Sequence, residues 1–341
     1  MSEPVPGGRP TLEEVAARAG VSRATVSRVV NGGAGVRDAL VEKVRKAVDE
    51  LGYIPNHAAR TLVTRRNGAV AVIIAEPEFR IFSDPFFERQ VRGISRELSA
   101  HDTQLVLLWV EDTGDHERIA RYLGGGHVDG ALAFSLHDDD ELPAIIRRAQ
   151  VPSVFGGRPG WTGPDGSPEV PYVDCDNRGG ARAAVRHLRA LGRSRIAHIA
   201  GPRDQTSALD RLHGYRDELP GGDADLVVDG DFTRESGARA MTVLLERRRD
   251  LDAVFAANDL MAAGALEILR ERGARVPEDV AVVGFDDMPA VAESTSPPLT
   301  TVRQDIEGMG RLMVRQLMRT LDGERVGALI TPTDLVRRAS A

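Results

Sequence analysis

Apolar residues recur at helical spacing in two short segments near the start of the chain, first at Leu12, Val15, Ala16 and Ala19 and then at Ala24, Val26, Val29 and Val30. Thr11 and Glu14 have the spacing of a capping box, in which each side chain bonds the backbone of the other. Gly20 supplies a left-handed residue after the first segment, and Ser22 can cap the second. The pattern predicts two helices joined by a tight turn within residues 11–31.

A third amphipathic helix is predicted from about Arg37 to Leu51. Gly52 would end this helix, and Tyr53 and Ile54 would fold back on its last turn. The three predicted helices share enough apolar positions to form one small core. The sequence therefore predicts a compact three-helix head over residues 11–53.

From residue 69 the chain changes to near-continuous apolar runs of strand length that alternate with amphipathic segments. The predicted strands span 69–75, 104–110, 129–135, 151–157, 195–201, 225–230, 251–258 and 279–287. The predicted helices span 85–100, 116–123, 141–150, 178–191, 208–219, 235–248, 259–272 and 306–321. This alternation indicates parallel α/β sheets that are buried on both faces, and it occurs in two successive series.

The second helix of the head carries a polar outer set, made of Ser22, Arg23, Thr25, Ser27 and Arg28. Small hydroxyl and basic side chains on one helix face suit the major groove of DNA, where arginine pairs with guanine edges. An ordinary capped helix pair in a bundle would show the same pattern. These residues alone therefore leave both interpretations open.

Charge is unevenly distributed along the chain. The whole chain has a net charge of −7, but residues 1–67 contain 11 basic and 7 acidic side chains, which leaves −11 on the remainder. A basic head on an acidic body favours contact with nucleic acid at the head alone. No apolar run is long enough to span a membrane, the N-terminus lacks the apolar core of a signal peptide, and Cys175 is the only cysteine, so a cytoplasmic protein is expected.

Two longer stretches resemble the DNA-binding end of the lactose-repressor family of bacterial regulators, namely VAARAGVSRATVSRVVN at 15–31 and VRDALVEKVRKAVDELGYIPNHAARTL at 36–62. The resemblance implies a homodimer on palindromic double-stranded operator DNA. It also implies a hinge helix over about 56–63, in which Leu62 wedges into the minor groove. The DNA-binding residues that it implies are Thr11, Ser22, Arg23, Ala24, Thr25, Ser27, Arg28, Asn31, Tyr53, Asn56, His57, Ala59, Arg60 and Leu62.

The resemblance extends over the rest of the chain and implies its fold class. A small all-α helix-turn-helix domain would precede an α/β effector domain of two doubly wound parallel-sheet lobes, similar to type I periplasmic binding proteins. The expected organisation is a disordered arm at 1–10, a helix-turn-helix domain at 11–54, a hinge helix and linker at 55–67, and an effector-binding and dimerisation domain at 68–341. Lobe one would comprise about 68–173 and 304–333, and lobe two about 174–303.

Ligands of doubly wound sheets bind beyond the carboxyl ends of the strands, and the predicted strand ends here carry polar and aromatic residues. The family resemblance implies effector contacts from seven positions, which are Phe86, Phe87, Arg211, Phe232, Asn258, Asp286 and Gln304. Structural alternatives apply to several of them. Phe86 and Phe87 could be core residues at a helix start, Asp259 could cap a helix instead of touching ligand, and Arg211 could pair with a carboxylate.

Signals for catalysis are weak. Asp286 and Asp287 suggest a glycosidase, but adjacent residues on a strand point to opposite faces and are poor partners across one bond. The HDDDE segment at 137–141 could hold a cation, although a solvated helix start explains it better. The chain lacks zinc-type histidine spacing, a G-x-G-x-x-G or P-loop motif, and a G-x-S-x-G elbow. Neither an enzyme nor a bound metal or cofactor is expected.

The sequence thus predicts a dimeric transcriptional repressor whose operator affinity is controlled by a small molecule, with a sugar inducer as the leading candidate. The stretches AARTLVTRR, HVDGALAFSLHDDD and VFGGRP are similar to actinobacterial regulators of cello-oligosaccharide or β-glucoside uptake. Two alternatives stay open. One is a regulator that needs a purine or another metabolite as co-repressor, and the other is a sugar-binding protein or an enzyme on the same scaffold.

Overall fold

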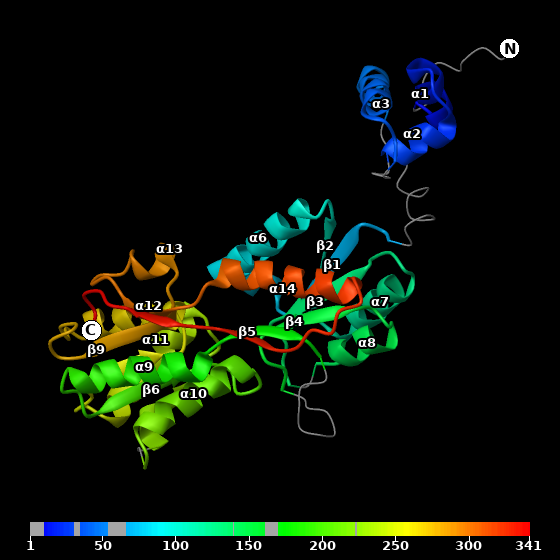
Figure 1. Ribbon diagram of the computed structural model, residues 1–341. Helices are drawn as coiled ribbons and strands as arrows, with labels where there is room; N and C mark the ends of the chain where they lie inside the picture. The colour runs from blue at the N-terminus through cyan, green and yellow to red at the C-terminus, as the bar shows by residue number, and fades with distance from the viewer. Residues whose placement is uncertain (1–9, 31–34, 54–65, 139, 161–169, 222–223) are drawn as a thin grey trace. The chain divides into compact units, whose positions relative to one another are not determined.

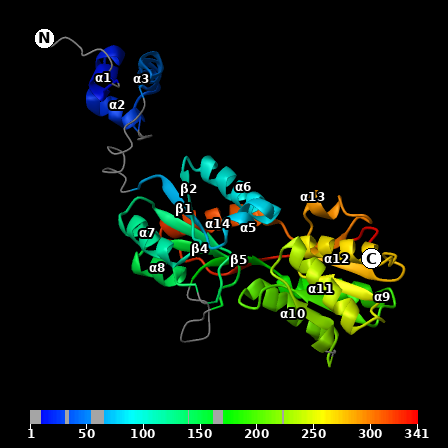
Figure 2. The same cartoon turned by 180° about the vertical axis from the view of Figure 1, so that it is seen from behind.

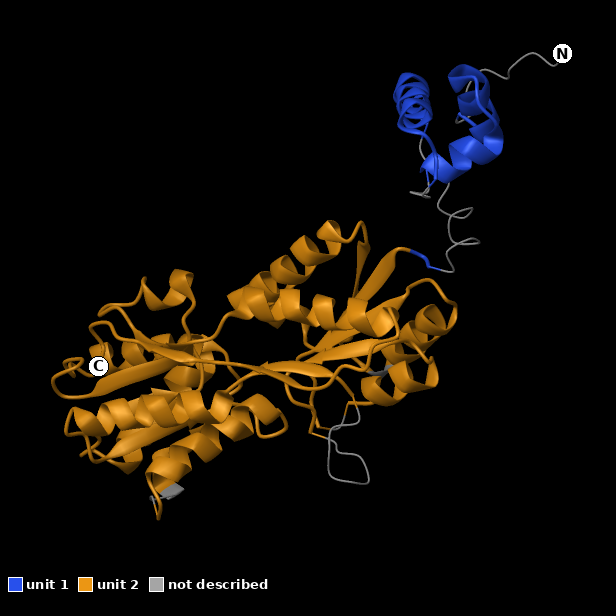
Figure 3. Ribbon diagram, in the orientation of Figure 1, with its two compact units in different colours: residues 1–67 blue, residues 68–341 orange. Residues whose placement is uncertain are grey.

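The computed structural model describes residues 10–30, 35–53, 66–138, 140–160, 170–221 and 224–341. It divides into two compact units, residues 1–67 and residues 68–341, which Figure 3 distinguishes by colour. Most of the expected N-terminal arm and the expected hinge helix lie outside the described residues. The same holds for six of the expected DNA contacts, which are Asn31, Asn56, His57, Ala59, Arg60 and Leu62.

The first unit contains three helices among its described residues, α1 (Leu12–Ala19), α2 (Arg23–Val30) and α3 (Asp38–Leu51). The predicted capping box is confirmed, because Glu14 N donates to Thr11 Oγ1 at 3.3 Å and Thr11 N donates to Glu14 Oε2 at 2.8 Å. Gly20 and Gly52 end α1 and α3 in the left-handed region, with φ of 64° and 62°. These signals fix the lengths of the two helices.

The core of the first unit consists of Val15, Ala16, Val26, Val44, Ala47 and Tyr53. Tyr53 folds back as predicted, since its backbone N–H donates to Val48 O at 3.0 Å and its ring is buried. The prediction that Ala24 belongs to the apolar face of α2 is wrong, because Ala24 is exposed. At two residues before Val26 it lies about 200° around the helix from that buried side chain.

The second unit is built on two six-stranded sheets. The first sheet has the order β11-β5-β4-β3-β1-β2 and is parallel throughout. Its strands are β1 (Ala69–Ile74), β2 (Gln104–Trp109), β3 (Gly130–Phe134), β4 (Ser153–Gly156), β5 (Tyr172–Cys175) and β11 (Leu329–Thr331). Its helices are α5 (Glu78–Ser83), α6 (Pro85–Ala100), α7 (Thr113–Gly124), α8 (Leu142–Arg148) and α14 (Ile306–Leu321). We call this set the first lobe.

The second sheet has the order β12-β10-β9-β8-β6-β7, in which only the β10–β12 pair is antiparallel. Its strands are β6 (Ile196–Ala200), β7 (Val227–Asp229), β8 (Ala253–Ala256), β9 (Ala281–Asp286), β10 (Thr300–Arg303) and β12 (Asp334–Val336). Its helices are α9 (Asn177–Ala190), α10 (Thr206–Glu218), the 3-10 turn η1 (Ala224–Leu226), α11 (Arg234–Arg247), α12 (Asp259–Glu271) and α13 (Pro289–Ala292). We call this set the second lobe.

Helices cover both faces of each sheet, as the continuous apolar strands predict. Figures 1 and 2 show opposite sides of the second lobe, with α9 and α10 in front in one view and α11 and α12 in front in the other. In β1, Val70, Val72 and Ile74 join one core cluster while Ala71 and Ile73 join another. A strand with apolar side chains on both faces has no polar positions to alternate, which explains the unbroken AVAVIIA run.

The chain passes between the lobes three times, after β5, after β10 and between β11 and β12. Figure 1 shows the last passage as the red segment near the C-terminus. The sequence predicts passages near Val173–Asp174 and Thr301–Gln304, and the third was not predicted. Strands β11 and β12 have three residues each, which is too short for a periodic pattern. The passages bring the carboxyl ends of both sheets to a common cleft.

Among the described residues, no helix is both long and apolar enough to cross a membrane. The longer predicted helices and the strands of the two series occur within a few residues of their predicted bounds. Helices α5 and α13 and strands β5, β10, β11 and β12 were not predicted. All six are six residues or shorter, so that each carries little periodicity of its own.

Candidate functional site

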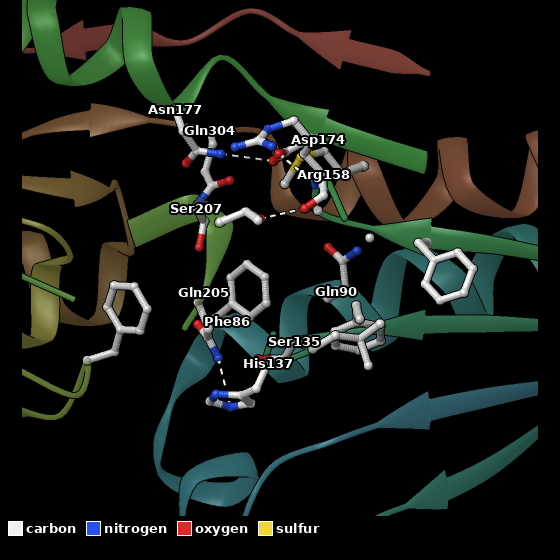
Figure 4. Close-up of a pocket in the computed structure, with 18 of the residues that line it drawn as sticks. Phe86, Gln90, Ser135, His137, Arg158, Asp174, Asn177, Gln205, Ser207 and Gln304 are labelled. Atoms are coloured by element: carbon white, nitrogen blue, oxygen red, sulfur yellow. Dashed lines mark hydrogen bonds between the residues drawn. The ribbon is translucent and has the colours of Figure 1, made fainter. Parts of the chain in front are cut away.

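A cavity lies between the two lobes, where strands from both sheets end (Figure 4). The first lobe contributes the segments that follow β3 and β4, together with α5 and the start of α6. The second lobe contributes the segments that follow β6, β7, β8, β9 and β10. A parallel sheet leaves its ligand groups at the carboxyl ends of its strands, so two facing sheets create a cleft with polar walls on both sides.

Six of the seven predicted effector residues line this cavity, namely Phe86, Arg211, Phe232, Asn258, Asp286 and Gln304. The prediction for Phe87 is wrong, because Phe87 is 1% exposed and stacks on Phe134 with ring centroids 6.3 Å apart. Asp84 caps α6 by accepting from Phe86 N at 2.9 Å, which fixes the direction of the first helical turn. Consecutive residues in that turn point in different directions, so Phe86 faces the cavity and Phe87 the core.

Arg211 of α10 is held from several sides. Its Nε donates to Asn177 Oδ1 at 2.9 Å, and its Nη1 donates to Ala257 O at 2.5 Å. Nη1 also lies 3.5 Å from Asp286 Oδ1, and the guanidinium lies 3.7 Å from the Phe285 ring centroid. Arg211 therefore both pairs with a carboxylate and lines the cavity. Such a fixed guanidinium presents its remaining donors to a ligand without losing rotamer entropy on binding.

Asp286 is buried at the end of β9 and accepts from Gln304 Nε2 at 2.6 Å. Burial raises the pKa of Asp286 to about 7, against the opposing effect of Arg211. Its neighbour Asp287 instead pairs with Arg303 at 2.6 Å and with Arg338 at 2.7 Å. The two adjacent carboxyl groups therefore contact different side chains, and the structure does not place them as a catalytic pair.

Asn258 is the N-cap of α12, with its Oδ1 accepting from Met261 N at 2.9 Å. Its Nδ2 donates to Phe232 O at 2.9 Å and fixes the loop that presents the Phe232 ring. The alternatives for Asp259 are both wrong, because this residue neither caps the helix nor lines the cavity. It is fully buried and accepts from Met288 N and the Thr301 hydroxyl at 2.7 and 2.5 Å.

Most of the cavity wall in the first lobe, and part of the wall in the second, was not predicted from the sequence. The additional polar residues around the cavity are Arg80, Asp84, Gln90, Ser135, His137, Asp138, Arg158, Asp174, Asn177, Gln205, Thr206 and Ser207. The solvated-helix interpretation of HDDDE is wrong for His137, whose Nδ1 lies 2.7 Å from Asp204 Oδ2 in the other lobe. The rule that ligand groups follow strand ends, applied to SLHD after β3 and GRP after β4, would have found these segments.

Ionisable side chains of both signs line the cavity. The guanidinium groups of Arg80, Arg158 and Arg211 face the carboxyl groups of Asp84, Asp138, Asp174 and Asp286. Burial raises the pKa of Asp84 and of Asp174, so both carboxyl groups resist ionisation. The many directed donors and acceptors and the two aromatic rings of this site suit a polyhydroxylated molecule.

The outer face of α2 is available for DNA contact within the described part of the head. Ser22, Arg23, Ala24 and Arg28 are exposed, and Thr25 and Ser27 are partly exposed. Ser22 Oγ accepts from Thr25 N at 3.1 Å, as predicted for a cap. Arg23 Nε lies 2.8 Å from Glu13 Oε1, and the arginine side chain is 68% exposed. Exposed ion pairs of this kind are weak, so Arg23 can leave Glu13 for a base edge or a phosphate.

Two of the other expected DNA contacts have structural roles in the head. Thr11 is exposed and uses its hydroxyl to cap α1. Tyr53 is 7% exposed and packs in the core of the head, and its contact with DNA stays a prediction. In the described ranges no group of three or more histidine, cysteine, aspartate or glutamate side chains could hold a metal ion.

Comparison with known proteins gives two family matches. Residues 11–56 match the family described as bacterial regulatory proteins of the lacI family. Residues 185–341 match the periplasmic binding protein-like domain. The first match covers the described head, and the second covers most of the second lobe together with α14 and the C-terminal strands. The two matches agree with the division of the chain into a helical head and an α/β body.

Individual relatives match over nearly the whole chain. The HTH-type transcriptional regulator CelR of Thermobifida fusca is 50% identical over 97% of this chain and 98% of its own length. The ribose operon repressor of Escherichia coli K12 is 33% identical over 97% of this chain and 99% of its own.

Two solved structures share the architecture. A CelR–cellobiose complex aligns with a TM-score of 0.77 and 48% identity, covering 98% of this chain and 100% of that one. The Lac repressor dimer bound to operator and the anti-inducer ONPF aligns with a TM-score of 0.83 and 30% identity, covering 98% and 99%. This family consists of transcriptional regulators and not of enzymes. The chain therefore belongs to the lacI family of bacterial regulatory proteins and is a DNA-binding transcriptional regulator.

Proposed function

We propose that this chain is a transcriptional repressor whose effector is cellobiose or a longer cello-oligosaccharide. The observation that carries the proposal is the likeness to CelR, at 50% identity over 97% of this chain, together with a CelR structure that is a cellobiose complex. The effector would bind in the cleft between the lobes. The effector residues would be Phe86, Arg211, Phe232, Asn258, Asp286 and Gln304, which line the cavity.

The chemistry of the cleft supports a glucose oligomer as ligand. Arg211, Asn258, Asp286 and Gln304 provide donors and acceptors whose positions are fixed by mutual hydrogen bonds or by backbone contacts. Hydroxyl groups of a sugar both donate and accept, so such a mixed set can satisfy them. The rings of Phe86 and Phe232 offer apolar surface of the kind that covers the C–H face of a pyranose.

The proposed mechanism joins the cleft to DNA through a dimer. Two copies of the chain would place two heads on the halves of an inverted-repeat operator. Effector in the cleft would favour one angle between the lobes and so change the separation of the two hinge segments. A coupling of about 1–3 kcal/mol would change operator affinity about 5–150-fold. As a sugar inducer, the effector would release the repressor from its operator.

Isothermal titration calorimetry of the full chain tests the effector assignment. Cellobiose and cellotriose are expected to bind, whereas maltose, lactose and hypoxanthine are expected to give no binding heat. The discrimination should follow from unpaired polar groups in the cleft when a hydroxyl is misplaced. Binding of hypoxanthine without binding of cellobiose would replace the proposal with the co-repressor alternative.

A further inference from the structure

Glu76 is a buried carboxylate directly behind the effector cavity. It follows β1, is 2% exposed, and is not itself one of the lining residues. Its Oε1 accepts from Arg80 Nη1 at 2.7 Å, from Ser135 Oγ at 2.6 Å and from Gln205 Nε2 at 3.0 Å. All three donors line the cavity. One carboxylate oxygen therefore positions three side chains of the site.

Two of these donors belong to the first lobe and the third to the second. Arg80 and Ser135 lie on α5 and after β3, while Gln205 precedes α10. The Gln205–Glu76 hydrogen bond therefore exists only while the lobes are in contact. Removing it would leave a buried carboxylate with one donor fewer, which is costly in a low-dielectric setting. Glu76 thus favours the arrangement in which both walls of the cleft meet.

Arg80 makes a second connection across the cleft. Its guanidinium lies 5.3 Å from the ring centroid of Phe232 in the second lobe and 5.8 Å from that of Phe87 in its own. The side chain is 9% exposed, and within the described residues its Nε has no hydrogen-bond partner. Glu76 therefore fixes Nη1 of a side chain that lines the cavity and contacts an aromatic ring of each lobe.

His137 adds a third connection to the same group. Its Nδ1 lies 2.7 Å from Asp204 Oδ2 in the second lobe, and its Nε2 lies 3.5 Å from Glu76 Oε1 in the first. Figure 4 shows His137 beside Gln205, with the two Nε2 atoms 3.1 Å apart. Beside them, Asp138 N donates to Asp204 O at 2.9 Å. The rim of the cleft is therefore closed by polar contacts that centre on Glu76.

We propose that Glu76 is the positioning residue of the effector cleft, which holds Arg80 and Ser135 for a neutral sugar and couples ligand binding to lobe closure through Gln205 and His137. The ligand in this inference rests on the proposed function. The positioning itself rests on the contacts of Glu76 alone, which are present without any ligand.

Closure through this contact set depends on pH. The charged and titratable groups that face His137 are Glu76, backed by Arg80, in the first lobe and Asp204 in the second, with Asp138 adjacent in the chain. The hydrogen bond to Glu76, aided by Asp204, raises the pKa of His137 to about 9. Separation of the lobes would remove Asp204 but leave Glu76 beside His137, so the pKa of His137 would fall without returning to its ordinary value. Closure therefore raises the pKa of His137 further, so ligand affinity falls as the pH rises through the titration of His137 toward about 9.

Calorimetry with cellobiose compares the wild type, Glu76→Gln and the control Glu267→Gln. Glu267 is half-exposed and pairs with Arg234 inside the second lobe at 2.7 Å, so its change removes one carboxylate charge away from the cleft. Glu76→Gln is expected to weaken binding at least about tenfold at pH 7 and to move the pH dependence of affinity to lower pH. The control is expected to match the wild type in both. Unchanged affinity and an unchanged pH profile in Glu76→Gln would overturn the inference.

A second variant and a ligand-free measurement test the inference independently of Glu76→Gln and of cellobiose binding. Asp204→Asn changes a half-exposed side chain, so it is expected to fold, and it is expected to weaken the pH dependence of affinity because it removes the cross-lobe partner of His137. Proton NMR titration of His137 without ligand is expected to give a pKa near 9 that falls by at least one unit in Glu76→Gln. If cellobiose does not bind the wild type, the proposed function fails, and this titration still decides the inference. A His137 that titrates near 6.5 in both proteins would contradict it.

Discussion

Single residues at the ends of second-lobe strands adopt backbone conformations that few side chains tolerate. Phe232, Asp286 and Asp287 have φ of 66°, 109° and 52°. Such conformations persist only where surrounding contacts impose them, and they concentrate at functional sites. Here the contacts are known, since Asn258 bonds Phe232 O and Gln304 bonds Asp286. This part of the second lobe is thus built at a cost in stability.

Asp286→Asn tests a separate cost, which is the burial of an ionisable carboxyl group. Burial raises the pKa of Asp286 to about 7, above its value in the unfolded chain, so the folded state loses stability as the pH rises from about 4 through 7. Asparagine removes that charge. The difference in free energy of unfolding between the variant and the wild type is measured by urea denaturation at pH 5 and at pH 8. This difference is expected to favour the variant by roughly 1–3 kcal/mol more at pH 8 than at pH 5.

The exposed Asp279 is the matched control for this measurement. Its hydrogen bonds with Arg275 lower the pKa of Asp279 to about 2, so its contribution to stability is lost only as the pH falls below about 4. Asp279→Asn should therefore have the same effect at pH 5 and at pH 8. Equal effects at both pH values for Asp286→Asn as well would contradict the assigned pKa of Asp286.

Arg23 is the residue of the head with the clearest consequence for DNA recognition. Arg23→Ala is expected to weaken binding to the selected operator by about 1–3 kcal/mol if the side chain reads a guanine edge. Fluorescence anisotropy with operator and with scrambled duplex measures the difference. Arg178→Ala, which removes the same charge from an exposed site in the other unit, should change neither affinity. An equal loss of affinity on both duplexes in Arg23→Ala would show a phosphate contact instead.

Elements with long periodic patterns were predictable, and short ones were not. The capped pair α1 and α2, the amphipathic helices α6 and α14, and the apolar strand β1 all follow from local pattern and end signals. Helix α5 escaped prediction because its six residues have Phe79 and Phe82 exposed and Arg80 buried, which inverts the usual pattern. The ion pair with Glu76, four residues earlier, and the contact of the guanidinium with the Phe232 ring keep this arginine buried. The contact with Phe232 joins segments that are far apart in the sequence, and no local rule contains it.

Packing between α6 and α14 offers a test at the scale of elements. An ideal Cβ added to Gly93 would lie 2.1 Å from Glu307 O on the facing helix. Gly93→Ala must therefore push the helices apart, and we expect a loss of about 1–3 kcal/mol or more in the free energy of unfolding. Gly124 ends α7 with no atom within 4 Å of its added Cβ. Gly124→Ala should leave stability unchanged or raise it slightly, and equal losses in both variants would contradict the close approach.

At the scale of the whole molecule, the sequence predicted two doubly wound lobes but could not show which residues meet across the cleft. The second-lobe residues from Arg211 to Gln304 were found through family resemblance and strand ends. The opposing residues of the first lobe, including Arg80 and His137, were missed. Their role depends on contacts between segments more than 60 residues apart, such as Gln205 with Glu76. Periodicity and capping rules describe neighbours along the chain and carry no such information.

The central claim is that a sugar held between two lobes governs the affinity of the head for DNA. The most direct measurement is the anisotropy of a labelled inverted-repeat duplex, selected from a random library with the full chain, during titration with cellobiose or maltose. The account predicts that saturating cellobiose raises the operator Kd about 5–150-fold while maltose leaves it unchanged. An operator Kd that is the same with and without cellobiose, in a protein that binds cellobiose, would contradict it.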